Sequence, residues 1–225
     1  MRKLLIALAG LVAFVTLATG AYALVDLLAL EHRDRTFTVA AAETVHLDVD
    51  GGGTVRVVGD GGDEVRVEAR WREGVKGPSI AVRNTGDRVT VDTSCPTFVN
   101  MVCRVSATVH VPRGTLVTGG GDSPIQVVDV GGRVDLSTEN GSVTVEGADG
   151  SVRVSTENGA INLADSAGAV SLSTDNGRIT ASGVRATSLV ASTSNGRIVL
   201  DLAAAPDSVV ARSSTWPLFS RAMMV

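Results

Sequence analysis

A five-residue segment, Ser-Thr-Glu-Asn-Gly or a close variant of it, recurs in the second half of the chain at almost constant spacing. The first residues of the four copies are Ser137, Ser155, Ser173 and Ser192. The intervals between them are 18, 18 and 19 residues, and a fainter copy 18 residues earlier has Asp122 where the first has Asn140. Such a period predicts one structural unit stacked on itself, because a single short repeat cannot bury its own apolar face.

Each copy has the periodicity of β-strands. Apolar and polar residues alternate on both sides of the Asn-Gly pair, which is typical of strands and not of helices. When the copies are aligned, the apolar positions form four columns that we expect to face inward. The columns are Val134, Val152, Val170 and Leu189; Leu136, Val154, Leu172 and Ala191; Val143, Ile161, Ile179 and Ile198; and Val145, Leu163, Ala181 and Leu200.

Two all-β architectures fit this pattern. In a β-solenoid each repeat is one rung and like columns stack, whereas in an antiparallel meander each Asn-Gly closes a two-residue type I′ hairpin. Aromatic residues make up 3% of the chain, and none lies between Phe98 and Trp216. Aliphatic columns suit rungs stacked about 4.8 Å apart. We therefore predict a β-solenoid of about 18-residue repeats over residues 113–213, with the meander as the alternative.

The asparagines of the four turns are candidates for a structural ladder. Their side chains could hydrogen-bond from rung to rung, or serve only as turn residues, since Asn tolerates and Gly freely adopts the left-handed conformation. The four residues are Asn140, Asn158, Asn176 and Asn195. The serine column three residues before them is expected to face outward, where it would meet a glycan or solvent.

The acidic residues of the turns form a column of like charge. Calcium would relieve the repulsion among Glu139, Glu157 and Asp175 with oxygen ligands. Ser194 interrupts the column, however, and the calcium-binding nonapeptide pattern is absent. We expect an exposed acidic edge and no metal.

The beginning of the chain has the features of an export signal or anchor. After Arg2 and Lys3, residues 4–25 carry no charge, and as a helix they would span about 33 Å, close to one bilayer core. We predict that residues 1–30 are a single transmembrane helix and residues 31–40 a linker, with the C-terminal domain outside the cytoplasm. In the alternative, cleavage after Ala21-Tyr22-Ala23 would release a secreted protein.

The two cysteines agree with an exported domain. Cys95 and Cys103 lie between two strand-like runs, where an oxidising compartment favours a disulfide; two free buried thiols are the alternative. Residues 41–112 are predicted to be an N-terminal β region that contains this pair and covers the open edge of the repeats. Residues 214–225 form an atypical tail, either a cap over the last rung or an altered terminus, because Thr215 and Trp216 stand where Asn-Gly is expected.

Composition excludes several classes of function. The net charge is −4 and basic residues form no stripe, which argues against nucleic-acid binding. Three histidines and two cysteines leave little for zinc or Cys-His catalysis. A polysaccharide-cleaving enzyme needs converging carboxylates, which the pattern does not offer. We expect no catalysis and no cofactor.

The membrane segment, the cysteine pair and the serial Ser-Thr-Glu-Asn-Gly repeats resemble the bacterial putative-adhesin family, whose β-strand-repeat domain has no established function. The resemblance covers residues 40–213, and the tail from Trp216 to Val225 departs from it. It implies a membrane-anchored extracytoplasmic adhesin or envelope binding module whose partner is an unknown envelope protein or glycan. The alternatives are an envelope-stress regulatory partner of a membrane sensor and a polysaccharide-active β-helix enzyme.

Overall fold

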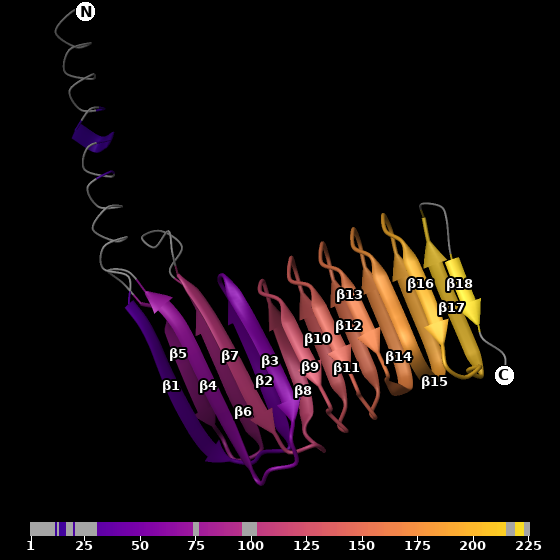
Figure 1. The fold of residues 1–225 in the computed structure, drawn as a ribbon, viewed down its shortest axis with the longest axis horizontal. Coiled ribbons are helices and arrows are strands. Elements are labelled where there is room, and N and C mark those ends of the chain that lie inside the picture. Colours follow the sequence, from indigo (N-terminus) through magenta and orange to yellow (C-terminus); the bar gives the residue numbers. More distant parts are fainter. Residues whose placement is uncertain are drawn as a thin grey trace, which may run out of the picture.

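The computed structural model describes residues 12, 14–16, 20, 31–73, 77–95, 103–214 and 219–222; of residues 31, 73 and 219–222 it describes the backbone alone. From residue 31 onward these residues form an all-β body of strands stacked side by side along one long axis (Figure 1). The strands belong to two hydrogen-bonded ladders, and the buried side chains of both belong to one core. Among the described residues no helix is both long and apolar enough to cross a membrane. Most of the predicted anchor, residues 4–25, lies outside the described part of the chain.

The first ladder begins at the end of the molecule where the described body starts. Its strands, in spatial order, are β1 (Glu31–Ala40), β4 (Glu64–Glu73), β7 (Arg104–Val111), β3 (Gly53–Gly59), β9 (Ile125–Val128), β11 (Val143–Glu146), β13 (Ile161–Ala164), the first half of β15 (Ile179–Thr193), β16 (Ile198–Leu202) and β18 (Phe219–Ala222). The pairs β1–β4 and β4–β7 are antiparallel, and all the others are parallel.

The second ladder runs along the same axis and is also described from the N-terminal end of the body. In spatial order it contains β5 (Ser79–Asn84), β6 (Arg88–Ser94), β2 (Thr44–Asp50), β8 (Leu116–Gly121), β10 (Val134–Thr138), β12 (Val152–Thr156), β14 (Ala167–Thr174), the second half of β15 and β17 (Ser208–Ser213). Only β5–β6 is antiparallel.

The repeats pair in parallel and in register. Val134 lies opposite Val152, and Ile161 opposite Ile179, so each residue meets its counterpart in the next copy. The two strands on either side of each Asn-Gly belong to different ladders and do not pair with each other within residues 103–214. The Asn-Gly pairs therefore do not close hairpins. We call two consecutive strands, one from each ladder, a rung.

The inward-facing columns are confirmed. None of their sixteen side chains is more than 3% exposed, and together they run through a single core that extends from Ala42 to Leu202. This core is aliphatic; Phe37 is a partly buried neighbour of it. Period-two alternation thus specified which side of each strand is buried, because successive side chains of a strand point to opposite faces.

The glycines of the turns serve a different purpose from the one expected. Neither the Asn nor the Gly of the four turns has a positive φ; among described residues other than glycine, positive φ occurs at Asp129 and Asp165. A β-carbon on Gly159 would instead collide with the carbonyl oxygen of Gly141 in the preceding rung. The expectation of a left-handed turn is therefore wrong, and glycine is required here because backbones of adjacent rungs approach closely.

The N-terminal region is built into the same stack. The rung of β2 and β3 lies between the rung of β6 and β7 and the first repeat rung of β8 and β9. Beyond it, β1, β4 and β5 run antiparallel to their neighbours. The region does lie at the N-terminal edge of the repeats, but as a continuation of both ladders with a shared core.

The predicted linker over residues 31–40 is wrong. These residues form β1, which pairs with β4 along its whole length from Glu31 to Ala40. Phe37 and Val39 pack against the core, while His32 to Thr36 are exposed. The charged first half hid the strand from sequence reasoning, although charge on an edge strand is a common way to prevent unwanted pairing.

The C-terminal tail returns to the stack. Phe219–Ala222 pairs in parallel with β16 as β18, so a strand follows where the Asn-Gly turn is missing. Trp216, the residue expected to cap the last rung, lies outside the described residues. Val209, the counterpart of buried Leu189, is 45% exposed in the last rung of the second ladder.

Candidate functional site

The four turn asparagines lie in one continuous line of side-chain hydrogen bonds. Each asparagine donates from its Nδ2 to the Oδ1 of the residue one rung before it. The distances are 2.9 Å for Asn158 to Asn140, 2.8 Å for Asn176 to Asn158, 2.9 Å for Asn195 to Asn176, and 3.3 Å for Asn140 to Asp122. Asp122 can begin the line because the first member needs only to accept.

A second column, of buried threonines, lies under the asparagines and was missed by the sequence reasoning. Its members are Thr138, Thr156, Thr174 and Thr193, none more than 6% exposed. The Thr156 hydroxyl accepts from the Gly159 N–H at 3.0 Å, and the Thr174 hydroxyl does the same for Gly177 at 2.9 Å. The Thr174 hydroxyl also donates to the Gly159 carbonyl at 3.1 Å. Thr174 thereby joins its own turn to the preceding one, and Thr156 does the same by donating to the Gly141 carbonyl at 3.4 Å.

Beside the ladder, a shallow polar hollow of about 490 Å³ runs across three rungs. Its walls are provided mainly by the outward serines and the acidic column, Ser137, Ser155, Ser173, Glu139, Glu157 and Asp175, which we call the serine–carboxylate face. Ser155 donates its hydroxyl to Ser137 at 3.0 Å, so the serines are themselves linked between rungs. The three carboxylate side chains are exposed.

The chemistry of this face is hydrogen bonding. Hydroxyls that donate or accept alternate with carboxylates that only accept, at the regular separation of parallel strands. Aromatic rings are absent from its lining. Within the described residues, no three His, Cys, Asp or Glu side chains are grouped so that they could hold a metal ion. The face is suited to a polar partner with several hydroxyl or amino groups.

The two cysteines are joined by a disulfide, with their α-carbons 5.9 Å apart. Cys95 directly follows β6 and Cys103 directly precedes β7, so the bond closes the connection between the two strands of one rung. Gly51 lies against it with a φ of 87°, and a β-carbon there would come within 2.8 Å of the Cys95 β-carbon. The disulfide therefore also fits against the turn of the next rung.

The histidines are placed apart from the serine–carboxylate face. His46 contacts the Thr118 hydroxyl at 3.1 Å, and His110 contacts the Asp60 carboxylate at 2.8 Å beside Arg66. Partial burial opposes ionisation of Asp60, but the Gly62 N–H, His110 and Arg66 outweigh it and lower the pKa of this carboxyl. None of the described residues that line the hollow around this pair is a serine, threonine or cysteine. These lining residues offer no hydroxyl or thiol nucleophile beside the pair.

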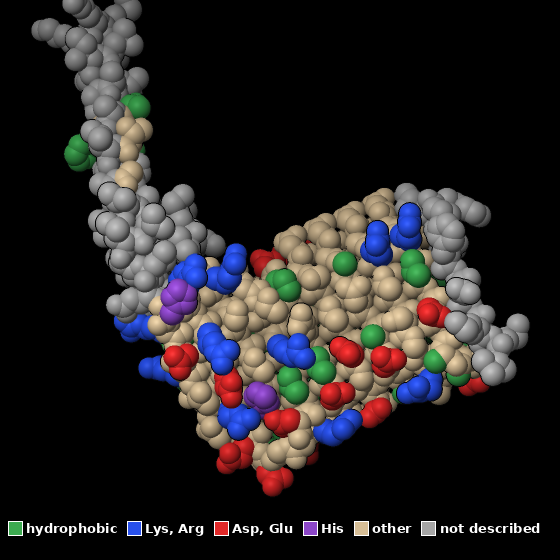
Figure 2. All heavy atoms as spheres, in the orientation of Figure 1, with side chains coloured by type: hydrophobic (Ala, Val, Ile, Leu, Met, Phe, Trp, Pro, Cys, Tyr) green, Lys and Arg blue, Asp and Glu red, His purple; other side chains and the backbone are tan. Residues whose placement is uncertain are grey.

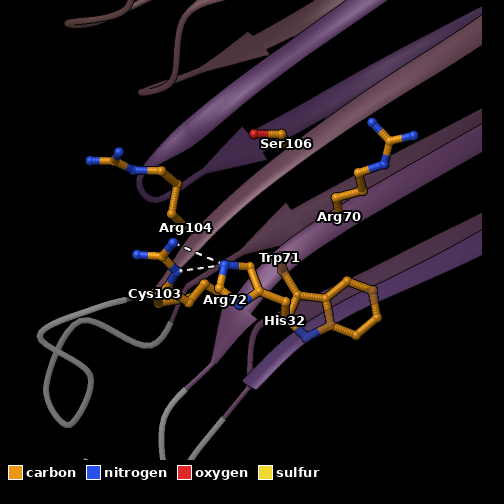
Figure 3. A pocket seen from close by; sticks show the side chains of 7 residues that line it. All are labelled: His32, Arg70, Trp71, Arg72, Cys103, Arg104 and Ser106. Atoms are coloured by element: carbon orange, nitrogen blue, oxygen red, sulfur yellow. Dashed lines mark hydrogen bonds between the residues drawn. The ribbon is translucent and has the colours of Figure 1, made fainter. Parts of the chain in front are cut away.

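The third histidine belongs to a basic hollow at the N-terminal end of the first ladder. His32, Arg70, Arg72, Arg104 and Ser106 line it together with Trp71 and Cys103 (Figure 3). Three strands that are distant in sequence contribute these residues, which is why no basic cluster was visible along the chain.

No family model matches the chain, and no curated protein sequence matches it. Among solved structures it is similar to a putative cell adhesion protein from Clostridium sporogenes, at 9% identity and a TM-score of 0.44 over 81% of this chain and 100% of that one. It is also similar to a putative adhesin from Bacteroides fragilis, at 14% identity and a TM-score of 0.48 over 85% and 95% of the two chains. A putative adhesin from Parabacteroides distasonis aligns at 15% identity and a TM-score of 0.37, over 81% and 95%.

The neighbours named here are all bacterial putative adhesins. At identities this low, no residue role transfers from these proteins to this chain.

Proposed function

We propose that this chain is a membrane-anchored extracytoplasmic binding module of the adhesin type, without catalytic activity, built as a two-sided β-solenoid. The observation that carries the proposal is the serine–carboxylate face: hydroxyls and carboxylates recur on successive rungs and line one hollow of about 490 Å³. A stack of like rungs presents such groups along an extended surface, which is how repeat proteins commonly bind their partners.

The proposed partner is a polar polymer of the cell envelope, in particular a glycan with free hydroxyl or amino groups. The carboxylates of Glu139, Glu157 and Asp175 accept hydrogen bonds and attract positive charge, so an amino sugar complements them and an anionic polymer does not. The regular spacing of the rungs favours a partner that repeats as well. Because stacking rings are absent from the lining, affinity comes from several weak contacts in parallel.

The turn architecture supports this role by holding the face rigid. The asparagine ladder lies at one side of the hollow, and the buried Thr156 and Thr174 bond to the turn backbone beneath it. A face whose side chains are already ordered loses less entropy when it binds. The ladder and the threonines are therefore proposed to act as support, and the serines and carboxylates as the contacts.

Membrane attachment is proposed through residues 4–25, whose uncharged length suits one bilayer core. The measurement is fractionation of cells that express the full chain, followed by washing of the membranes with alkaline carbonate. An anchored chain stays in the washed membrane fraction. Recovery of a chain that begins near residue 24 in the medium would establish cleavage and secretion instead.

Binding is tested by co-sedimentation of the detergent-solubilised full chain with insoluble chitin, with chitosan and with peptidoglycan. The double variant Glu157→Lys/Asp175→Lys reverses the charge at the centre of the face, and we expect it to weaken binding by tenfold or more, roughly 1.4 kcal/mol. Glu146→Lys/Asp201→Lys, on the exposed surfaces of β11 and β16, makes the same change in net charge away from the face and should bind as the wild type does. Equal binding by both variants would remove the serine–carboxylate face from the proposal.

A further inference from the structure

One register row across the first three strands of the first ladder consists of basic side chains. His32 of β1 lies opposite Arg72 of β4, and Arg72 lies opposite Arg104 of β7. In the next row, Arg70 lies opposite Ser106. These side chains surround a hollow of about 410 Å³ (Figure 3). Figure 2 shows Lys and Arg side chains, with a histidine among them, at this end of the molecule.

Among the described residues, none neutralises the positive charge of this row through an ion pair. Arg72 donates from Nε and from an Nη to His32 Nε2, at 3.1 and 2.9 Å. An imidazole nitrogen that accepts a hydrogen bond carries no proton, so His32 orients the guanidinium without offsetting its charge. In the described part of the chain, no carboxylate forms an ion pair with Arg70, Arg72 or Arg104.

Arg72 and Arg104 also oppose each other directly on adjacent strands, an arrangement of like charges that destabilises a sheet. The acidic residue in register with this group is Asp34, opposite Arg70 and one row farther along the strands. An anion placed between the two guanidinium groups would remove the repulsion. Guanidinium groups match the geometry of phosphate oxygens with paired N–H donors, and the Ser106 hydroxyl adds a further donor.

The position of the hollow in the chain indicates which phosphate is within reach. The uncharged run of residues 4–25 ends six residues before β1 begins, and six residues span at most about 20 Å. The hollow lies at the end of β1 where the chain enters the domain, since Arg72 is the second-last residue of β4 and Arg104 the first of β7. Trp71 lines it too, and indole rings favour the headgroup region of membranes.

We propose that this hollow binds the phosphate of an anionic lipid headgroup and thereby fixes the orientation of the domain on the outer surface of the membrane. The inference rests on the membrane attachment in the proposed function. It concerns residues separate from the serine–carboxylate face, which lies on the repeat rungs and is left free for its partner.

The test uses the fluorescence of Trp71 in the full chain, in a Trp216→Phe background and in lipid nanodiscs formed with a tryptophan-free scaffold protein, so that this indole is the only one in the sample. Discs of phosphatidylcholine alone are compared with discs in which roughly one third of the lipid is phosphatidylglycerol. We expect the Trp71 emission to shift only with phosphatidylglycerol. Arg72→Gln/Arg104→Gln should lose the shift in these discs, because both guanidinium groups that would hold the phosphate are gone. Arg72→Lys keeps the positive charge but lacks the paired N–H donors of a guanidinium group. Its fluorescence shift should be smaller than that of the parent and larger than that of the double variant.

The control is Arg153→Gln, which removes one positive charge from the exposed surface of β12 and should respond as the parent does. Circular dichroism melting verifies that each variant is folded. A shift retained in the double variant, a shift absent with phosphatidylglycerol, or a shift produced by inorganic phosphate with neutral discs but not by the anionic lipid would each overturn the inference. Failure of the chain to enter any disc would overturn the attachment as well, whereas normal incorporation without a lipid-dependent shift overturns the headgroup site alone.

Discussion

The side-chain amide of Asn176 donates to the side-chain oxygen of Asn158 one rung earlier, at 2.8 Å, and the amide of Asn158 donates in the same way to Asn140, at 2.9 Å. A residue in the middle of this line takes part in two such bonds, and Asn195 at its end in one. The line follows the same edge of the stack as the backbone hydrogen bonds of the turns, such as Asn158 N–H to the Glu139 carbonyl at 2.9 Å. Position along the ladder should therefore determine how much each asparagine contributes.

Asn158→Ala should lower the free energy of unfolding by about 1–3 kcal/mol, because it removes two side-chain hydrogen bonds of roughly 0.5–1.5 kcal/mol each. Asn195→Ala should cost about half as much. Asn162→Ala, on the exposed surface of β13, is the control and should change stability by less than about 0.5 kcal/mol. Urea unfolding followed by circular dichroism measures all three. Equal losses at Asn158 and Asn162 would mean that the ladder contributes nothing.

Thr156→Val should destabilise the domain by about 1–3 kcal/mol despite its similar volume. The substitution leaves the Gly159 N–H without its acceptor in a buried turn, and an unpaired buried donor costs its full desolvation energy. The control is Thr144→Val on β11, whose side chain is partly exposed. Hydrogen exchange at the Gly159 amide should accelerate in the Thr156 variant. If its protection is unchanged, the assigned bond is not the one that holds the turn.

Gly159→Ala should cost about 1–3 kcal/mol, because the added methyl group meets the Gly141 carbonyl of the adjacent rung and the rungs must separate. Gly114→Ala provides the comparison: nothing lies within 4 Å of its β-carbon position, and its φ is not positive. That substitution should be neutral or slightly stabilising, since alanine reduces the freedom of the unfolded chain. Thermal melting measures both variants. A lower melting temperature for Gly159→Ala alone would show that the close approach of the next rung, and not the loss of a glycine as such, is responsible.

Asp60→Asn should weaken the domain at pH 7 by less than about 1 kcal/mol, since the cluster with His110 and Arg66 is partly exposed to solvent. Because folding lowers the pKa of Asp60, its contribution is present above the unfolded value of 3.8 and disappears as the pH falls through the lower folded value. Wild type and variant should therefore converge once the pH lies below the folded pKa. Asp63→Asn is the neighbouring control. A difference that persists in acid would show that the carboxylate charge is not its origin.

The repeat part of the fold was predictable because its signals are local. Alternation of apolar residues identified the buried columns, and the interval of 18 residues is the parallel register itself, with Val134 opposite Val152. The asparagines were recognised for the same reason: their recurrence at the period places them at one corner of every rung. The buried Thr156 could have been recognised too, since an alternation that continues past Leu136 and Val154 points the threonines inward.

The N-terminal region was less predictable because its pairings depend on order in space. In the sequence β2 and β3 come before β6 and β7, yet in space they lie between β6–β7 and the repeats, and β1 lies at the far edge. Without a repeat there is no period from which to infer a register. The basic hollow was not predictable for the same reason. Arg72 and Arg104 are 32 residues apart in the chain and become neighbours only through the β4–β7 pairing.

The amino-acid sequence by itself determined the all-β class, the aliphatic core of the repeats and the side chains that face it, because alternation and period are properties of neighbouring residues. Only the tertiary structure decided the order of the first strands, the reason for glycine at each turn, and the groups that share the two hollows. Those features depend on how closely one rung approaches the next and on which distant strands become neighbours. Neither the distance between rungs nor the pairing of distant strands is encoded in a local pattern.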